Sequence, residues 1–337
     1  MPFREPSWWY NEKNSLTASV LEPVSNIYGF ISKRRMLQSI DRKITLPIIC
    51  VGNFTAGGTG KTPLTILLSK IVRELGGQPV FLSRGYGGRL KYPHQVILQR
   101  DTARDVGDEP LLLAKYAKVV VSRDRVLGAE LIRNDKLGNV IIMDDGLQHP
   151  RLHKDLVVAV IDGKRGIGNG LTIPAGPLRA PVGVQLSFTH ALVVYGKPSP
   201  DTASFLKPLR QPIFKASIKP VGNLEWITKK PLLAFSGIGN PKRFYDLLKT
   251  LGGSLMEARS FSDHHLYTIK DTKSLIIRAE SLGAQLVTTE KDLARFDSEL
   301  SDSHHHIREI VKVLKIDTQF SQAETSVLKT LVMKAIT

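Results

Sequence analysis

The stretch that decides the fold is Ile48-Ile49-Cys50-Val51-Gly52-Asn53-Phe54-Thr55-Ala56-Gly57-Gly58-Thr59-Gly60-Lys61-Thr62, an apolar strand followed by a glycine-rich turn. Glycines in such a turn let backbone N–H groups surround phosphate oxygens, and the N-terminus of the next helix adds partial positive charge. The usual pattern has Gly where Thr55 stands, so this loop is a variant whose flexibility comes from Gly57 and Gly58. The stretch predicts a phosphate-binding loop between a strand and a helix.

The residue types of the loop also predict roles. The residues expected to contact a bound nucleotide are Thr55, Ala56, Gly57, Gly58, Thr59, Gly60, Lys61 and Thr62. Lys61 would bridge the β- and γ-phosphates and so act in catalysis, and the Thr62 hydroxyl would bind Mg²⁺. The expected cofactors are therefore ATP and Mg²⁺.

A second apolar run, Val140–Met143, ends in Asp144-Asp145-Gly146. Carboxylates that follow a strand beside a phosphate loop hold Mg²⁺, either directly or through water. Asp-Asp-Gly is also an ordinary turn sequence. Its pairing with the phosphate loop favours the metal interpretation.

Strands alternate with amphipathic helices around this loop. The pattern predicts an α/β fold of the P-loop NTPase type, with a parallel sheet covered by helices on both faces. The expected strands are 44–51, 79–83, 118–122, 140–144, 156–161 and 191–195, and the expected helices are 61–75, 110–117 and 125–134. A second α/β unit begins near Pro231, with a strand over 232–236, a helix over 241–251 and a strand over 286–288.

This alternation suggests four parts. We expect an N-terminal helix over 1–35, a P-loop kinase domain over 36–200, a connecting segment over 201–230 that is rich in proline, and a smaller C-terminal α/β domain over 231–337. The last helix of the chain would be free to pack back on the first domain. The length of 337 residues agrees with roughly two globular domains.

The composition of the chain limits the kinds of partner and the cellular compartment that we expect. The chain has 47 Lys and Arg against 31 Asp and Glu, a formal net charge of +16, so an anionic partner is expected. Nucleic acid, an acidic membrane surface and a phosphorylated substrate would all fit. The one cysteine, Cys50, excludes a disulfide framework and favours the cytoplasm. The sequence lacks a signal peptide and a transmembrane-length apolar run, so the protein is not expected to be secreted.

Residues 15–35 have the periodicity of an amphipathic helix. Its apolar positions are Val20, Leu21, Val24, Ile27, Tyr28 and Ile31. The cations Lys33–Arg35 follow, and the aromatic residues Trp8–Tyr10 precede it, as in a helix that lies in a membrane interface. The alternative is a surface helix docked on the core by its apolar face. Either way, Pro23 predicts that the helix begins just before it.

Other nucleotide-binding classes fit less well. ATPases that sort chromosomes and septa carry an extra lysine just before the glycine pair, where this chain has Ala56. GTPases need an Asn-Lys-x-Asp motif, whereas residues 289–292 read Thr-Glu-Lys-Asp. The class that remains is a kinase that acts on a small substrate.

Several further clusters have an ordinary structural interpretation when taken alone. Ser83–Arg89 leaves a strand at its carboxyl end, where ligands bind in open α/β sheets, but it also reads as a glycine turn. Asp108 reads as a helix N-cap, Pro174–Arg179 as a rigid loop and His264 as a structural histidine. His304–His306 is expected to be a solvated loop, because three consecutive side chains cannot converge on one ion.

Together these clusters resemble the tetraacyldisaccharide 4′-kinases, the lipid A 4′-kinases of Gram-negative bacteria. The matching pieces are Val51–Asn53 with Thr55–Pro63, Ser83–Gly88, Gly107–Pro110, Asp144–His149, Gly168–Gly170 with Pro174–Arg179, Ser236–Gly239, Phe261–His264 and Thr289–Asp292. The resemblance spans nearly the whole chain. It implies transfer of the γ-phosphate of ATP to the 4′-hydroxyl of a tetraacylated glucosamine disaccharide 1-phosphate. It also implies the cytoplasmic face of the inner membrane as the location, an anionic membrane surface as a partner, and no nucleic acid.

The resemblance implies roles for individual residues as well. Asp108 would be the catalytic carboxylate, working with His264 as a dyad that takes the proton from the sugar hydroxyl. Asp144 and Asp145 would organise the dyad and Mg²⁺, with Asp145 touching the metal. The lipid head group or the transferred phosphate would be lined by Arg84, Tyr86, Glu109 and Arg179. The rival from another class is a peripheral-membrane P-loop ATPase that acts as a nucleotide switch and needs no such dyad.

Overall fold

The computed structural model describes residues 5–10, 15–38, 43–296 and 301–337. Its helical elements are η1 (Ser7–Trp9), α1 (Leu16–Met36), α2 (Lys61–Glu74), α3 (Ala103–Val106), α4 (Asp108–Leu113), α5 (Arg125–Asn134), α6 (Val182–Ser187), α7 (Pro200–Leu206), α8 (Trp226–Lys229), α9 (Pro241–Thr250), α10 (Ile269–Ser281), α11 (Glu290–Leu293), α12 (Asp302–Ile310) and α13 (Gln322–Ile336). Its strands are β1 (Ile48–Asn53), β2 (Pro79–Ser83), β3 (His94–Gln95), β4 (Val119–Val121), β5 (Val140–Asp144), β6 (Leu156–Asp162), β7 (Ala191–Tyr195), β8 (Ile213–Val221), β9 (Leu232–Ser236), β10 (Leu255–Ser260), β11 (Gln285–Thr289) and β12 (Lys312–Gln319).

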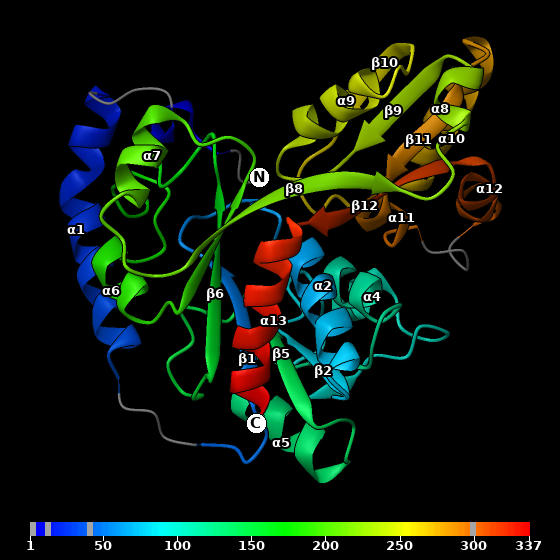
Figure 1. Ribbon diagram of the computed structural model, residues 1–337. Coiled ribbons are helices and arrows are strands. Elements are labelled where there is room, and N and C mark those ends of the chain that lie inside the picture. Colours follow the sequence, from blue (N-terminus) through cyan, green and yellow to red (C-terminus); the bar gives the residue numbers. More distant parts are fainter. Residues whose placement is uncertain (1–4, 11–14, 39–42, 297–300) are drawn as a thin grey trace.

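The strands form one twelve-stranded sheet in the order β10-β9-β11-β12-β8-β7-β6-β1-β5-β2-β4-β3 (Figure 1). Neighbours are parallel except in the pairs β3–β4 and β8–β12. The phosphate-loop strand β1 lies between β5 and β6, with Cys50 level with Met143 and Val157. The α/β fold expected from the sequence is confirmed. Because β1, β5 and β6 are buried along their whole length, both faces of the sheet are covered there.

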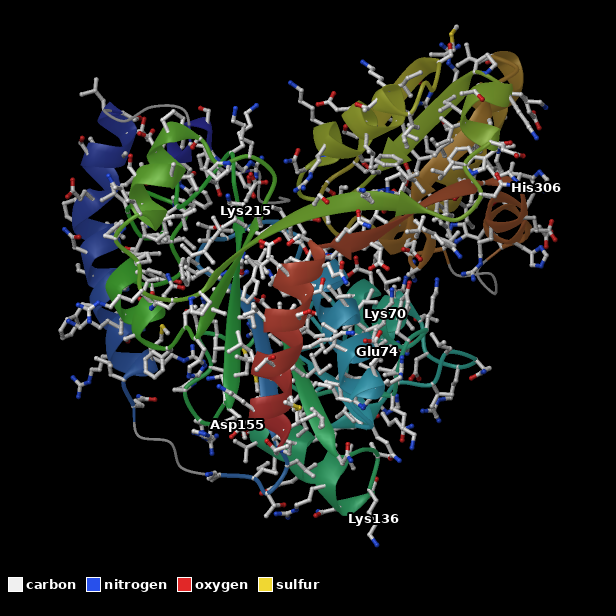
Figure 2. All side chains as sticks on the ribbon, in the orientation of Figure 1. Lys70, Glu74, Lys136, Asp155, Lys215 and His306 are labelled. Carbon is white, nitrogen blue, oxygen red and sulfur yellow. The ribbon has the colours of Figure 1, made fainter. Side chains whose placement is uncertain are left out.

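The covering helices supply two cores. On one face α2 and α13 pack over β1 and its neighbours, with Leu64 of α2 and Leu328 of α13 fully buried. On the other face α5 packs through Val126 and Ile132. The last helix thus lies on the half of the molecule that carries the phosphate loop. Glu74 of α2 forms an ion pair with Lys329 of α13, and Lys70 of α2 forms one with Asp317 of the preceding strand β12 (Figure 2).

The segment expected to connect the two units is itself structured. It contains α7 and the nine-residue strand β8. Ile213–Ala216 of β8 pairs with β7, and Ser217–Val221 pairs with β12, so one strand belongs to both halves of the sheet. The prolines 198, 200, 208 and 212 lie outside β8, which leaves its first seven residues able to donate in the sheet. The antiparallel ribbon β8–β12 therefore links the phosphate-loop half to the C-terminal half (Figure 1).

Helix α1 differs from expectation in its start, and its docking contradicts the alternative in which its apolar face packs on the core. It begins at Leu16, so the prediction that it begins just before Pro23 is wrong. It docks through small residues rather than through its apolar face: Ser25 Oγ donates to Thr172 O at 2.6 Å, and Thr172 Oγ1 donates back to Ser25 O at 2.6 Å. A Cβ on Gly29 would lie 3.1 Å from Thr172 Oγ1, which shows how closely the backbones approach. The exposed side chains include Leu16, Val20, Val24, Ile27, Phe30 and Ile31.

The prediction of a solvated loop at His304–His306 is wrong. These residues belong to α12, whose N-terminus is capped by Ser301. His304 is 1% exposed and packs against Phe296 with ring centroids 5.5 Å apart, whereas His305 and His306 face solvent. Consecutive residues on a helix point in different directions, so the cap places one histidine inside and two outside. In the described ranges, no helix combines the length and apolar character needed to cross a bilayer.

Candidate active site

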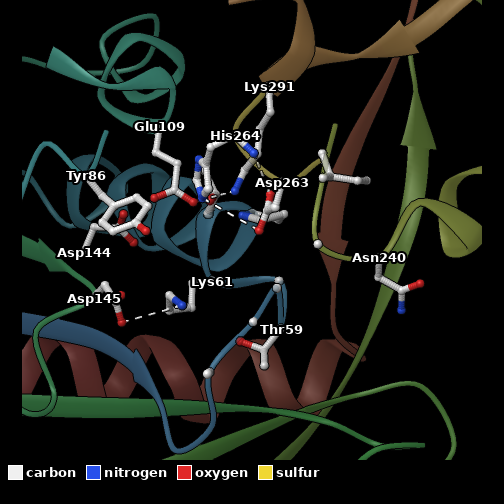
Figure 3. Close-up of a pocket in the computed structure, with 18 of the residues that line it drawn as sticks. Thr59, Lys61, Tyr86, Glu109, Asp144, Asp145, Asn240, Asp263, His264 and Lys291 are labelled. Atoms are coloured by element: carbon white, nitrogen blue, oxygen red, sulfur yellow. Dashed lines mark hydrogen bonds and ion pairs between the residues drawn. The ribbon is translucent and has the colours of Figure 1, made fainter. Parts of the chain in front are cut away.

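The phosphate loop leaves β1 at Asn53 and enters α2 at Lys61. Gly60 adopts a left-handed conformation with φ of 91°, which a side chain would strain, and it serves as the N-cap of α2. The backbone amides of residues 57–60 donate to no acceptor in the part of the chain that the structure describes. Lys61 Nζ lies 3.1 Å from Asn53 Oδ1 and 3.6 Å from Asp145 Oδ1 (Figure 3). The loop thus directs the unpaired backbone amides of residues 57–60 and the Lys61 ammonium toward one point.

Arg179 reaches this point because its loop is bonded to the phosphate loop through the backbone. Ala56 N donates to Pro177 O at 2.8 Å, and Arg179 N donates to Phe54 O at 2.9 Å. The Arg179 Nη1 atom then donates to Asp145 Oδ1 at 2.7 Å. The two loops are therefore one structural unit, although more than a hundred residues separate them in sequence.

The two adjacent aspartates after β5 differ in their electrostatics. Asp144 is 1% exposed and accepts from Thr65 Oγ1 at 3.2 Å. Burial, and next the nearby Glu109 and Asp145 carboxylates, raise the pKa of Asp144 to about 7. Asp145 is half-buried with φ of 54°, and burial would raise its pKa too, but Arg179 and Lys61 hold that pKa well below its usual range.

Asp108 is paired with His264 across the molecule. It is 5% exposed at the start of α4, whose N-cap is Gly107, so the Asp108 side chain does not cap the helix. Asp108 Oδ1 lies 3.0 Å from His264 Nδ1. Burial opposes the charged form of each group, yet the contact holds the pKa of Asp108 well below its usual range and raises the pKa of His264. His264 has a left-handed backbone, with φ of 57°.

Sequence reasoning missed Arg295, which holds this pair together. Arg295 is 4% exposed, and its Nε and Nη2 atoms donate to Asp108 Oδ2 at 2.9 and 2.5 Å. Its Nη1 donates to Gly237 O, which also accepts from the backbone N–H of His264 at 3.1 Å. The same Nη1 atom donates to Asp292 Oδ1 at 2.8 Å. Arg295 therefore positions both partners, and no local pattern in the sequence signals it.

Lys291 was also missed as a site residue, although its motif was noted. Lys291 Nζ lies 2.6 Å from Glu109 Oε1, so the carboxylate expected to line the substrate is held by a lysine from the other half of the sheet. Burial would raise the pKa of Glu109, but Lys291 lowers it overall. A Thr-Glu-Lys-Asp sequence after an apolar strand was the available signal.

The predicted residues converge on one cleft of about 1580 Å³ between the two halves of the sheet (Figure 3). All of them line it except Thr55 and Asp108, which are buried behind the loop and behind His264. The Tyr86 and His264 rings lie with centroids 5.1 Å apart. Arg84 is exposed at the rim, and Arg123 and Arg125, which sequence analysis did not select, line the same cleft.

A parallel sheet that delivers a phosphate loop, carboxylates and a buried carboxylate–imidazole pair to one cleft defines a P-loop phosphotransferase. The model of the tetraacyldisaccharide-1-P 4′-kinase family matches residues 17–336. The chain belongs to this family, and the prediction of a kinase is confirmed.

Individual relatives support the same family assignment. The chain is 47% identical over 296 residues to a tetraacyldisaccharide 4′-kinase of Bradyrhizobium diazoefficiens, covering 87% of this chain and 86% of that protein. It is 42% identical over 323 residues to one of Methylorubrum extorquens, covering 94% and 95%. A crystal structure of the "apo" form of LpxK from Aquifex aeolicus in complex with ATP superposes with a TM-score of 0.75 at 27% identity, covering 96% of this chain and all of that one.

Proposed function

We propose that this chain transfers the γ-phosphate of ATP to the 4′-hydroxyl of a tetraacyldisaccharide 1-phosphate, a step of lipid A synthesis, in the cleft between Lys61 and His264. The observation that carries the proposal is that His264 lines the cleft from the half of the sheet opposite the phosphate loop, and is held there by Asp108 of the phosphate-loop half. An ATPase that uses nucleotide only as a switch does not need an imidazole opposite the phosphates of ATP. The kinase assignment is therefore preferred over the switch.

The proton of the acceptor hydroxyl passes to the His264 imidazole. Both oxygens of Asp108 are occupied, one by His264 and one by Arg295, and the low pKa of Asp108 makes it a poor proton acceptor. His264 is 29% exposed on its side chain and lines the cleft, so it can meet the hydroxyl. Asp108 then orients the ring and stabilises its protonated form. Asp108 acts through His264.

Mg²⁺ fits the oxygen donors near the loop. We assign the metal to the Thr62 hydroxyl and to Asp145, with Asp144 beside them. Burial, and next the nearby carboxylates, raise the pKa of Asp144, and a dication would offset both effects. The described residues hold no cluster of three His, Cys, Asp or Glu side chains able to bind a metal alone. Mg²⁺ is thus expected to arrive with ATP, whose phosphates provide further ligands.

Lys61 and the free amides of residues 57–60 hold the phosphates and stabilise the charge that develops during transfer. Arg84, Tyr86 and Arg179 are proposed to contact the anionic head group of the lipid. Glu109 serves as the partner of Lys291, an ion pair between the two halves of the sheet that borders the transferred phosphate. We propose that residues 36–200 and 231–337 act as two domains joined through β8 and β12, with the last helix, α13, packed back on the first domain.

We further propose that α1 lies in the interface of an anionic membrane, at the cytoplasmic face of the inner membrane of a Gram-negative bacterium. Its apolar side chains point away from the protein, with Leu16 85% and Val20 77% exposed. Lys33, Arg34 and Arg35 occupy its last turn, where they can meet anionic lipid head groups. With substrate, nucleotide and membrane all anionic, the positive charge of the chain is explained without nucleic acid.

The test is to incubate the purified chain with labelled ATP, Mg²⁺ and the lipid disaccharide in mixed micelles, and to follow label in the lipid. Formation of the 4′-phosphorylated lipid is expected. ATP hydrolysis with no labelled lipid would favour the switch. A reaction that proceeds equally with excess chelator would refute the metal assignment.

A further inference from the structure

Residues 5–10 form a short strap that lies across the phosphate loop and lies outside the part of the chain matched by the family model. Trp9 anchors the strap. It is 1% exposed, its Nε1 donates to Pro174 O at 3.0 Å, and its carbonyl accepts from Asn169 N at 2.9 Å. The strap is therefore fixed on the loop that carries Arg179. This places its first described residue, Glu5, at the mouth of the phosphate loop.

The Glu5 carboxylate occupies the space directly over Gly57. A Cβ added to Gly57 would overlap Glu5 Oε1, so only glycine leaves room for this contact. Glu5 Oε1 is buried and has no hydrogen-bond partner among the described residues. Glu5 Oε2 accepts from Arg165 Nη1 at 2.7 Å. One oxygen of the carboxylate is thus paired with a guanidinium, and the other is left uncompensated beside the loop that binds phosphate.

Arg165 follows β6 and lines the same cleft as Lys61. Its guanidinium carbon lies 4.9 Å from the centre of the Tyr10 ring, so the strap contacts Arg165 at two points. Burial raises the pKa of Glu5, Arg165 opposes this, and the Asp263 and Asp162 carboxylates raise it further. Burial and, to a smaller extent, the two aspartates therefore disfavour the charged form of Glu5, and Arg165 is its counterion.

The surroundings become less favourable for Glu5 once a nucleotide is present. A triphosphate held by the loop amides would bring several negative charges next to the unpaired Oε1 atom. Arginine binds phosphate through paired N–H donors, and such charge-assisted bonds are stronger than neutral ones. Arg165 would then have a more highly charged partner than Glu5 within its reach.

We propose that Glu5 is a stand-in for phosphate, and that nucleotide binding displaces it and transfers the Arg165 guanidinium from Glu5 to the phosphate chain of ATP. Glu5 then sets the affinity for nucleotide, and Arg165 is a phosphate-binding residue of the reaction. The inference rests on the proposed nucleotide site, but concerns residues that the phosphate-loop motif does not include. The competing explanation is that Glu5 only braces Gly57, in which case its removal would loosen the loop and weaken binding.

Direct binding separates these explanations. Calorimetry with a non-hydrolysable ATP analogue and Mg²⁺ is performed on the full chain and on Glu5→Gln, which preserves shape and removes charge. We expect Glu5→Gln to bind the analogue about fivefold more tightly, as removal of one repulsion between charges about 4 Å apart and screened by water predicts. The matched control is Glu22→Gln on α1, which is exposed and should leave Kd unchanged.

Arg165→Ala is expected to weaken binding about tenfold or more, the loss of a hydrogen bond between charged groups. The double variant Glu5→Gln/Arg165→Ala should bind the analogue no more tightly than Arg165→Ala alone, because Arg165 is the residue that holds Glu5 in place. Weaker or unchanged binding by Glu5→Gln, or unchanged binding by Arg165→Ala, would overturn the inference while the nucleotide site stands. A complete lack of binding by the unmodified chain would refute the proposed nucleotide site, and the inference with it.

Discussion

Replacing His264 by Ala should remove the proton acceptor while the fold persists. Asp108 keeps its two bonds to Arg295 in this variant, so the buried carboxylate is not left without a partner. A positioned general base contributes about 10²–10⁴ in rate. We therefore expect kcat to fall by about that factor, which corresponds to about 3–5 kcal/mol of barrier. The affinity for ATP should change little, because Lys61 lies on a different element.

Asp108→Asn tests whether the two side chains act as one unit. It retains the size of the side chain and removes the charge that raises the pKa of His264. His264 must be neutral to accept a proton, so kcat/KM should fall as the pH drops through its raised pKa, above the ordinary value of 6.5. In Asp108→Asn this decline should move to lower pH. The double variant Asp108→Asn/His264→Ala should be little worse than His264→Ala alone, because coupled residues are not additive.

The assay is transfer of label from ATP to the lipid disaccharide in mixed micelles, with kcat and KM determined from pH 5 to 9 and thermal unfolding as the control for folding. Losses that multiply in the double variant would refute the coupling. A pH profile that Asp108→Asn leaves in place would refute the role of Asp108 in setting the pKa of His264.

Three further expectations concern other parts of the molecule. Lys61→Ala should lower kcat by at least about 10²–10³ without changing Tm, since it removes a preorganised charge at the phosphates; unaltered turnover would contradict the loop assignment. Val24→Asp and Ile27→Asp should each reduce flotation with anionic vesicles about tenfold, whereas Asn26→Asp on the same helix serves as the charge-matched control. Arg295→Met should destabilise the chain by about 3–5 kcal/mol in urea unfolding, because it leaves buried carboxylates unpaired; a smaller loss would show that they are compensated elsewhere.

The phosphate loop and the central strands could be predicted because their signals are local. The order of apolar run, glycine turn and Lys61 is contained in fifteen consecutive residues, and each central strand is apolar because it is buried on both faces. The carboxylates after β5 were found for the same reason. Parallel strands bring their carboxyl ends to one edge, so a residue placed there by sequence is near the loop in space.

Contacts between distant segments were beyond such reasoning. Arg295 lies 187 residues from Asp108 and follows no motif, so its role depends on how the two halves of the sheet meet. The direction of the apolar face of α1 was left open between two alternatives. Periodicity identifies an apolar face but not its direction, and here the hydrogen bonds between Ser25 and Thr172 turn that face outward. Asp108 was read as a cap on local grounds, and only the resemblance to a family pointed to its partner.

The crossing of the molecule by two hydrogen-bonded strands, rather than by a single linker, has a mechanical consequence. A single linker lets one body swivel about any axis, whereas the ribbon β8–β12 resists in-plane bending and sliding and yields mainly by twisting and by flexing out of its plane. Any movement between the two halves would therefore carry His264 along a restricted path relative to Lys61. Such a movement would also have to separate Asp108 from His264 and Arg295, so an opened cleft would present an incomplete set of catalytic groups to any water molecule that enters it.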